Sequence, residues 1–473
     1  MKPAWHGAGL GLLVTVLAGC AAPSGGGAPI RAAEALPPQW QAPLPHQGRI
    51  GDLSAWWAQF DDPLLTRLIA AAQQVSPNVA SAASRIEQSR AVRIAAGAGQ
   101  GPTLDMNGQL MRGAQDLGAP AATTASFGLQ ASWELDLFGG QRAATGAAQA
   151  RLESAQAAWH DARVSVAAEV ASRYTALRAC EAQLVLAQAD TTSRAETAHL
   201  TGLASGGGFR APSDAALARA SAAQGRAELT QRRTQCELDV KALVALTGIT
   251  EPTLREAMAA TRAQLPRPAQ IAIDSVPAQA LAQRPDLIGA ERELVAASAD
   301  VSQAQAQRLP RVSLSGSIAA ARAEAGPVSS NGTLWTIGPL AVSLPIFDGG
   351  TRRANVEAAR ARHAEAASTY RAKLRGAVRE VEEALVTLQG TADRSGDAQG
   401  AADGFHAAYL ATEARQRGGL ASLFELEDAR RSDLQAQTAL IDLQREQVLA
   451  WIGLYRALGG DWSANDTGSP PPH

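Results

Sequence analysis

The sequence predicts an α+β membrane protein built from two tandem repeats, each with two β-strands and a long helical hairpin. Three observations support this fold class. Sequence landmarks of the first half recur in the second half, in the same order. Segments of about a dozen residues alternate between apolar and polar side chains. Very long stretches without proline are dominated by residues that favour helices.

The first observation is the internal duplication. Pro285 and Pro310 each lie 208 residues after a first-half proline, Pro77 and Pro102 respectively. Further matches follow at offsets between 209 and 212, pairing Phe138 with Phe347, Gly208 with Gly419, and 245–248 with 457–460. Chance matches would not keep their order over such a length, so we predict two copies of one structural unit.

The second observation is alternation with a period of two residues. Between Ser126 and Phe138 every second side chain is apolar and the intervening ones are small or polar, including two acids. This pattern is typical of a strand between lipid and water; a soluble sandwich with one solvated face is the alternative. The alternation predicts strands at about 103–113, 124–137, 311–320 and 333–346. In the last strand the phase shifts at Gly338-Pro339, which predicts a β-bulge there.

The third observation concerns the helices. About 65 residues from Gly140 to Ala204 contain no proline, and a helix of that length would span roughly 100 Å. Its partner, from about Ser213 to Leu246, is roughly half as long. Aromatic residues make up only 4% of the chain, so these thin helices need neighbours to bury their apolar faces. We therefore expect an oligomer.

The N-terminus has the features of a targeting segment. Lys2 precedes an apolar run from Leu10 to Leu17, which ends in small residues before Cys20. This arrangement resembles the cleavage site of bacterial lipoproteins, which implies a signal peptide at 1–19, a lipid on Cys20 and a tether at 20–50. Ala21 takes the place of the aspartate that would imply retention in the inner membrane. An ordinary signal peptide with a chance cysteine is the alternative.

Charge and motif composition argue against several function classes. The formal net charge is −2, whereas a nucleic-acid-binding protein would carry a basic surplus. The seven histidines show no metal-binding spacing. Asp61 and Asp62 precede Pro63, as in a helix N-cap followed by proline at the first helical position, not as a catalytic acid pair. We therefore expect no enzyme activity, no cofactor, no metal and no nucleic-acid partner.

Four segments carry a family resemblance in chain order: Trp56–Leu64, Arg284–Leu287, Leu344–Gly350 and Tyr455–Trp462. Together they resemble the outer-membrane efflux family of TolC-like proteins, and in particular its lipid-anchored NodT branch. The resemblance implies a homotrimer with a 12-stranded outer-membrane β-barrel, continuous with a long periplasmic α-helical barrel. It places the first repeat at 51–270 with its hairpin at 139–248, the second at 271–462 with its hairpin at 349–460, and a flexible tail at 463–473.

The same resemblance implies a function and partners. Such proteins are passive exit ducts in tripartite efflux systems, driven by an inner-membrane pump through a periplasmic adaptor. We expect drugs or other small molecules as cargo and a pump of the resistance-nodulation-division type. A duct for type I protein secretion or metal efflux, and a periplasmic scaffold that never inserts into the membrane, are the alternatives.

The family closes its tunnel at the helical turns farthest from the membrane, which here contain Gly208 and Gly419. By the resemblance, the gate acids are Asp214, Glu425 and Asp428. Arg210, Arg415 and Arg417 are candidates for ion pairs that hold the turns together. The family's aromatic residue and arginine near the second turn are replaced by Gln416 and Ala421. The sequence therefore does not determine which contacts hold the tunnel closed. The acids could instead only stabilise the first turn of a helix.

Two cysteines flank the first of these turns. Cys180 lies about 29 residues before Phe209 and Cys236 about 27 residues after it. In an antiparallel helical hairpin these positions fall at nearly the same height. In an oxidising periplasm this arrangement predicts a disulfide, with two buried free thiols as the alternative.

Overall fold

The computed structural model describes residues 40–42, 53–114, 121–267 and 281–460. Cys20, the predicted signal peptide, the tail at 463–473 and all of the tether except 40–42 lie outside the described residues. The described chain divides into two compact units. The first unit holds Glu87–Ser154 and Ala290–Tyr370, and the second holds the described parts of Ala32–Ile86, Ala155–Gly289 and Arg371–His473.

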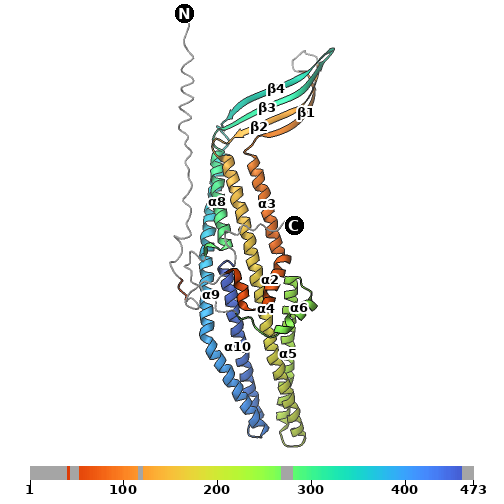
Figure 1. Cartoon of the computed structure of the whole chain (residues 1–473), viewed down its shortest axis with the longest axis vertical. Coiled ribbons are helices and arrows are strands. Elements are labelled where there is room, and N and C mark those ends of the chain that lie inside the picture. The colour runs from red at the N-terminus through yellow and green to blue at the C-terminus, as the bar shows by residue number, and fades with distance from the viewer. Residues whose placement is uncertain (1–39, 43–52, 115–120, 268–280, 461–473) are drawn as a thin grey trace. The chain divides into compact units, whose positions relative to one another are not determined.

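The first unit contains one antiparallel sheet of four strands in the order β1-β2-β3-β4 (Figure 1). β1 (Thr103–Gly113) and β2 (Ala122–Leu135) come from the first repeat, and β3 (Arg311–Ala325) and β4 (Val328–Ser343) from the second. β2 pairs with β3, so the two repeats meet in the middle of the sheet. β3 and β4 join through a tight turn in which Gly326 has a φ of 57°, a conformation that glycine adopts without strain.

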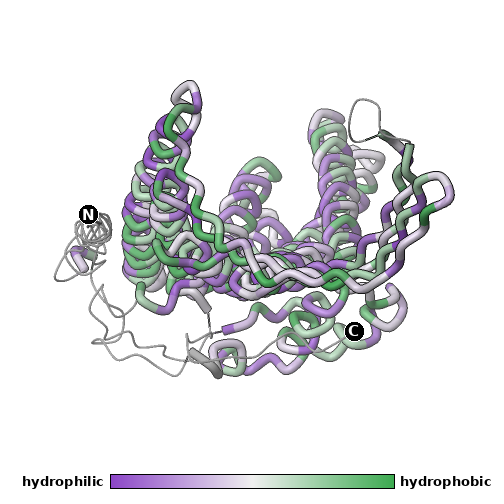
Figure 2. Tube along the Cα trace, turned by 90° about the horizontal axis from the view of Figure 1, so that it is seen from above, coloured by the Kyte–Doolittle hydropathy of each residue, from purple (hydrophilic) through white to green (hydrophobic). Residues whose placement is uncertain are grey.

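The register aligns the apolar residues of the four strands on one face. Met106 pairs with Leu129, Leu129 with Ile318, and Ile318 with Trp335. These side chains are 38–68% exposed. Figure 2 shows hydrophobic and hydrophilic residues interspersed along the strands, as an alternating sequence requires. Among the described residues, the sheet therefore presents an exposed apolar face.

The expected β-bulge is confirmed. Leu314 pairs with Leu340 but Gly316 pairs with Ile337, so one residue of β3 opposes two residues of β4, Gly338 and Pro339. Gly338 has a φ of 108°, which a residue with a side chain rarely adopts. The bulge keeps Ile337 and Leu340 on the same face although the apolar positions in the sequence are out of phase.

The two repeats have matching helices. α4 (Gly140–Gly206) and α9 (Thr351–Arg417) are both 67 residues long. Their partners α5 (Pro212–Thr247) and α10 (Leu423–Ala457) have 36 and 35 residues. The remaining helical elements are η3 (Leu53–Phe60), α2 (Pro63–Val75), α3 (Pro77–Ala98), α6 (Glu251–Met258), η4 (Ala259–Thr261) and α8 (Pro285–Ala306). Within the described ranges, no helix is both long and apolar enough to cross a membrane.

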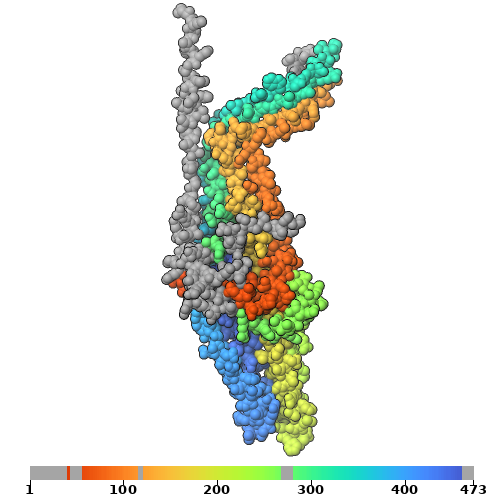
Figure 3. Space-filling view, viewed as in Figure 1, coloured from red at the N-terminus to blue at the C-terminus, as the bar shows by residue number. Residues whose placement is uncertain are grey.

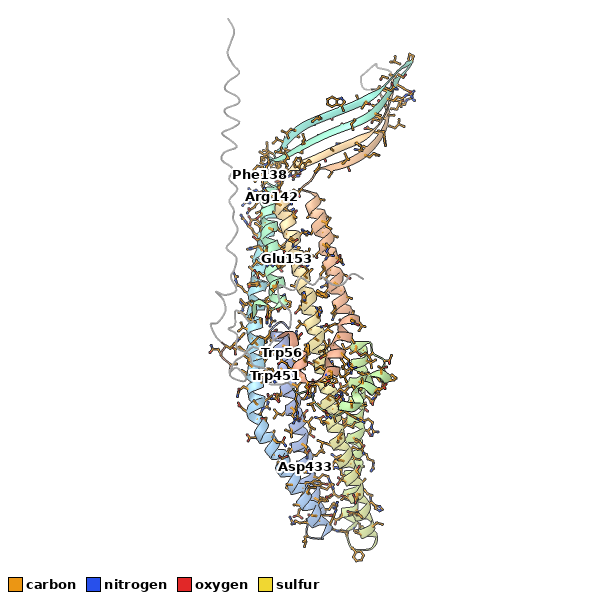
Figure 4. All side chains as sticks on the ribbon, viewed as in Figure 1. Trp56, Phe138, Arg142, Glu153, Asp433 and Trp451 are labelled. Carbon is orange, nitrogen blue, oxygen red and sulfur yellow. A yellow bond between two sulfur atoms is a disulfide. The ribbon has the colours of Figure 1, made fainter. Side chains whose placement is uncertain are left out.

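The core of the second unit is mostly aliphatic and contains a cluster of aromatic side chains. Trp56 lies 6.2 Å from Trp451 between ring centroids (Figure 4), and Trp57 lies 4.6 Å from the ring of Tyr455. The chain between η3 and α2 is fixed by Asp62, whose carboxylate accepts hydrogen bonds from the amides of Leu64 and Leu65. This confirms the N-cap expected from the sequence.

Two of the resembling segments meet in this core. The guanidinium of Arg284 donates two hydrogen bonds to Asp286 and one, of 2.7 Å, to the carbonyl of Ala457. Burial alone would raise the pKa of Asp286, but the Arg284 bonds and charge hold it below its ordinary value. Gly459 then passes so close to Arg284 that a Cβ atom would lie 2.8 Å from the Arg284 Cα.

We predict that Gly459→Ala destabilises the protein by more than about 1 kcal/mol, because Gly459 also has a φ of 90°. Thermal or denaturant unfolding in detergent measures this. Gly453→Ala is the matched control: this glycine lies inside α10 and its Cβ would meet no atom within 4 Å. The control should gain up to about 1 kcal/mol from helix propensity. Equal effects of the two substitutions would contradict the close contact with Arg284.

Candidate functional site

The candidate site lies at the ends of the two helical hairpins, which lie side by side in Figure 3, yellow-green for α4–α5 and blue for α9–α10. Both turns have the same backbone pattern. The amide of Phe209 donates to the carbonyl of Ala204, and that of Leu420 donates to the carbonyl of Arg415, each at 2.8 Å. Gly208 and Gly419 have φ values of 79° and 75°. Each long helix thus ends with a left-handed glycine, which satisfies its last carbonyls.

The second turn starts α10 with a capping box. The hydroxyl of Ser422 accepts a hydrogen bond from the Glu425 amide, and the Glu425 carboxylate accepts one from the Ser422 amide at 2.6 Å. These bonds to Ser422 hold the pKa of Glu425 below its ordinary value, and the charge of Arg415 adds to the effect. Glu425 is therefore ionised and engaged at the helix start, where a negative charge is stabilised by the helix dipole.

The other two candidate acids have looser contacts. Asp214 lies in the first turn of α5, with one oxygen 3.9 Å from the guanidinium of Arg210. The Asp428 side chain is 66% exposed and lies 3.7 Å from Arg431. Exposed pairs of this kind contribute about 0–1 kcal/mol. Both carboxylates are thus held weakly and remain accessible to ions.

The candidate arginines make local contacts. Arg415 donates to the carbonyl of Leu420 at 3.2 Å, which braces the turn. Arg417 pairs with Glu413, four residues earlier in α9, at 3.2 Å. The Arg210–Asp214 pair lies in the first hairpin and the contacts of Arg415 and Arg417 lie in the second, so none of these contacts joins the two hairpins. Within one chain, the described contacts of the three arginines therefore stabilise each turn separately.

A second group of charges joins the two hairpins, and sequence reasoning did not identify it. We call it the buried charge cluster: Asp190 and Arg194 on α4, and Glu427 and Arg430 on α10. Their side chains are only 4–9% exposed. Arg194 donates to Asp190 at 2.7 Å, and Arg430 donates to Glu427. Two acids and two bases make the cluster neutral, which offsets part of the cost of removing charges from water.

Hydroxyl groups connect the buried charge cluster across the helices. Ser221 of α5 accepts from Arg194 at 2.8 Å and donates to Glu427 at 2.6 Å. Burial raises the pKa of Asp190, and Glu427 acts in the same direction, whereas Arg194 and Arg430 lower it. The sequence signals for this group are Asp190 and Arg194 four apart and Glu427 and Arg430 three apart, a spacing that exposed helix faces also show.

Cys180 of α4 and Cys236 of α5 are joined by a disulfide with a Cα–Cα distance of 5.6 Å. It belongs to the large core of the second unit, and it joins the middle of α4 to the C-terminal part of α5. The disulfide therefore ties the two helices of the first hairpin together at a fixed height.

Comparisons with known proteins identify the architecture. The model of the family described as "Outer membrane efflux protein" matches residues 68–249 and 276–460. The chain belongs to this outer membrane efflux protein family. The two matched ranges correspond to the two repeats, which confirms the duplication read from the sequence. As a member of this family, the protein is the outer-membrane component of an efflux system.

Individual relatives agree with this assignment. The chain is 30% identical to the solvent efflux pump outer membrane protein SrpC of Pseudomonas putida, over 86% of this chain and 87% of that protein. It is 28% identical to nodulation protein T of Rhizobium leguminosarum bv. viciae, over 88% and 86%. The solved structure of the outer-membrane channel OprN has a TM-score of 0.81 at 28% identity and covers 90% of this chain and 97% of that one.

We predict that Cys180 and Cys236 of this efflux protein are oxidised in the isolated protein. Peptide mapping without reductant should recover the two cysteine peptides as one linked species that separates on reduction. Alkylation of both thiols before any reductant is added would contradict the prediction.

We predict that Ser422→Ala frays the start of α10, because the hydroxyl that accepts from the Glu425 amide is lost. The cost is about 0.5–2 kcal/mol, and it should appear as faster hydrogen exchange at the amides of Glu425 and its neighbours. Ser432→Ala is the matched control on the same helix, since the Ser432 hydroxyl donates only to the Asp428 carbonyl one turn back. Equal exchange in the two variants would show that the capping box has no effect.

Proposed function

We propose that this efflux protein is a passive exit duct: a homotrimer whose twelve strands close one outer-membrane β-barrel above an α-helical tunnel. The observation that carries the proposal is the exposed apolar face of the four-stranded sheet. In the described part of the chain β1 and β4 are the edge strands, and four strands are too few to close around water. Three copies supply partners for both edges and turn the apolar face toward lipid.

We further propose that the chain is anchored by a lipid on Cys20, after removal of the signal peptide at 1–19. Contacts of Gln41 and Ala42 support a tether at 20–50 that touches α9 at these two residues. Their two backbone amides donate to the carboxylate of Glu382 on α9, at 2.7 and 2.8 Å. Hydrogen bonds to a charged carboxylate are stronger than neutral ones, so Glu382 holds Gln41 and Ala42 against α9.

The remaining domain boundaries are also our proposal. The first repeat spans 51–270 and contains the hairpin 139–248. The second spans 271–462 and contains the hairpin 349–460, and the tail occupies 463–473. Gly459 and Gly460 in left-handed conformation support an end of the second hairpin at this point.

The partners we propose are a periplasmic adaptor and an inner-membrane pump of the resistance-nodulation-division type. Exposed apolar side chains at the hairpin ends support a docking partner there: Phe209 is 86% exposed, Leu420 75% and Phe424 73%. Side chains of this size are costly to leave in water. The names of the relatives, which include a solvent efflux pump component, favour drugs or other small molecules as cargo.

We propose that Asp214, Glu425 and Asp428 form the gate at the hairpin ends. Three chains would place nine carboxylates around one axis, which concentrates negative potential at the entrance and favours cations. The exposure of Asp428 supports its role as the acid that faces the passing ions. The protein supplies no chemistry of its own in this role, because an inner-membrane pump drives the transport.

Single-channel conductance in a planar bilayer tests this function. Wild-type protein should give a small, cation-preferring conductance. Glu425→Ser combined with Asp428→Ser should raise the conductance and remove the preference, because the carboxylates that attract cations are lost. Glu446→Ser combined with Asp442→Ser, on the same helix but roughly 20 Å farther along it, is the control and should change neither.

The outcomes separate the parts of the proposal. An unchanged conductance in the acid variant would keep the duct and reject the gate. No conductance from folded wild-type protein would reject the duct itself.

A further inference from the structure

One turn of α10 carries side chains in opposite environments. Glu427 and Arg430 are 9% and 4% exposed and belong to the buried charge cluster, whereas the side chain of Asp428 is 66% exposed. Successive residues of a helix point about 100° apart around its axis. The direction of Asp428 therefore follows from whatever fixes Glu427 and Arg430.

Glu427 fixes α10 against two helices of the other repeat. One carboxylate oxygen accepts the hydroxyl of Ser221 on α5 at 2.6 Å and lies 3.6 Å from the guanidinium of Arg194 on α4. The other oxygen accepts from Arg430. Both oxygens thus have partners, and each partner lies in a defined direction.

Arg430 makes a second, separate attachment to α4. Its guanidinium donates to the hydroxyls of Ser193 and Thr197 at 3.0 and 3.1 Å. Its Nε atom lies 3.9 Å from an oxygen of Asp190. Among the described residues, that nitrogen and that oxygen have no hydrogen-bond partner, so Arg430 and Asp190 attract each other through their opposite charges at this distance. The ring of Tyr409 on α9 covers the guanidinium at 5.8 Å.

These contacts restrict rotation of α10 more strongly than apolar packing would. Nearby apolar packing is small and consists of Ala218, Leu423 and Leu426, with Ala198 and Tyr409 against them. Apolar side chains exchange one contact for another at little cost when a helix turns. A buried carboxylate or guanidinium that turns away from its partner becomes an uncompensated charge, which is heavily penalised.

We propose that Glu427 and Arg430 are positioning residues: by binding Ser221, Arg194, Ser193 and Thr197, they set the rotation of α10 and so direct Asp428 to the entrance. The proposal rests on the proposed gate function. It assigns the direction of Asp428 to the buried charge cluster and not to the exposed arginines of the turns, whereas Glu425 is held by its own capping box with Ser422.

The test separates positioning from stability. In Glu427→Met combined with Arg430→Leu, one acid and one base are replaced together, and Asp190 keeps Arg194 as its partner. Replacing a buried ion pair by apolar residues of similar volume is often neutral or stabilising, so the unfolding temperature should not fall. The cation preference in planar bilayers should nevertheless fall to the level of Asp428→Asn.

Two further variants complete the experiment. In an Asp428→Asn background, the double substitution should cause no additional loss, because it acts through the direction of Asp428. Arg379→Leu combined with Glu383→Met is the control, since this exposed ion pair of 3.6 Å lies within α9 alone. The control should keep the full preference.

A folded double variant with the wild-type cation preference would overturn the proposal, and so would an additional loss in the Asp428→Asn background. If the double variant fails to assemble, Arg430→Lys decides. It keeps the charge but has one nitrogen in place of two, Nη1 that donates to Glu427 and Nη2 that donates to both hydroxyls. A partial loss of preference therefore supports positioning, and an unchanged preference overturns it. If Asp428→Asn alone leaves the preference intact, Asp428 does not select ions and the positioning role fails, whereas the duct and the other gate acids are still tested by the conductance experiment above.

Discussion

The packing of the second unit depends on the contacts that hold its thin, alanine-rich helices at a fixed spacing. The aromatic core around Trp56 and Tyr455 does this at one level, where α2, α4, α5, α9 and α10 all contribute buried side chains. Bulky residues are rare in the sequence, and the structure gathers several of them here. Between this core and the hairpin ends, apolar contacts become small, and the helices must be related to one another by other means.

The buried charge cluster takes over that role near the ends of the hairpins. Charged groups out of water are costly unless each one finds a partner in good geometry. Here two acids and two bases compensate each other, and serine and threonine hydroxyls accept or donate the remaining bonds. Such an arrangement adds little net stability, but it tolerates few alternative positions. The hairpin ends are thus related to one another by directional contacts and not by a broad apolar seam.

The two repeats are alike in outline and different in detail, and the differences fall at functional positions. Both long helices have 67 residues, and both turns end in the same left-handed glycine. However, α10 begins with Ser422 and a capping box, whereas α5 begins after Ala211, whose side chain cannot accept a hydrogen bond. The first hairpin is tied by a disulfide between α4 and α5. The two repeats thus have helices of equal length, but they differ in helix capping and in cross-linking. The start of α10 also holds two of the three proposed gate acids.

The sequence by itself determined the duplication, the long helices, the strands and the bulge at Gly338-Pro339, because these follow from local rules. Proline and glycine positions restrict the backbone, and residue periodicity defines which face of a strand or helix is apolar. The N-cap at Asp62 is equally local. The family resemblance followed from four short segments that occur in the family's order along the duplicated chain.

Only the tertiary structure decided which charges are buried. Glu427 and Arg430 have the spacing of an ordinary solvated pair, and nothing nearby in the sequence indicates that Ser221, more than 200 residues earlier, bonds to Glu427. Glu382 likewise looks like a surface charge until Gln41 and Ala42 are seen to donate to it. The physical reason is that burial and partner choice depend on helices brought together over long sequence distances, whereas turns, caps and periodicity are set by neighbours along the chain.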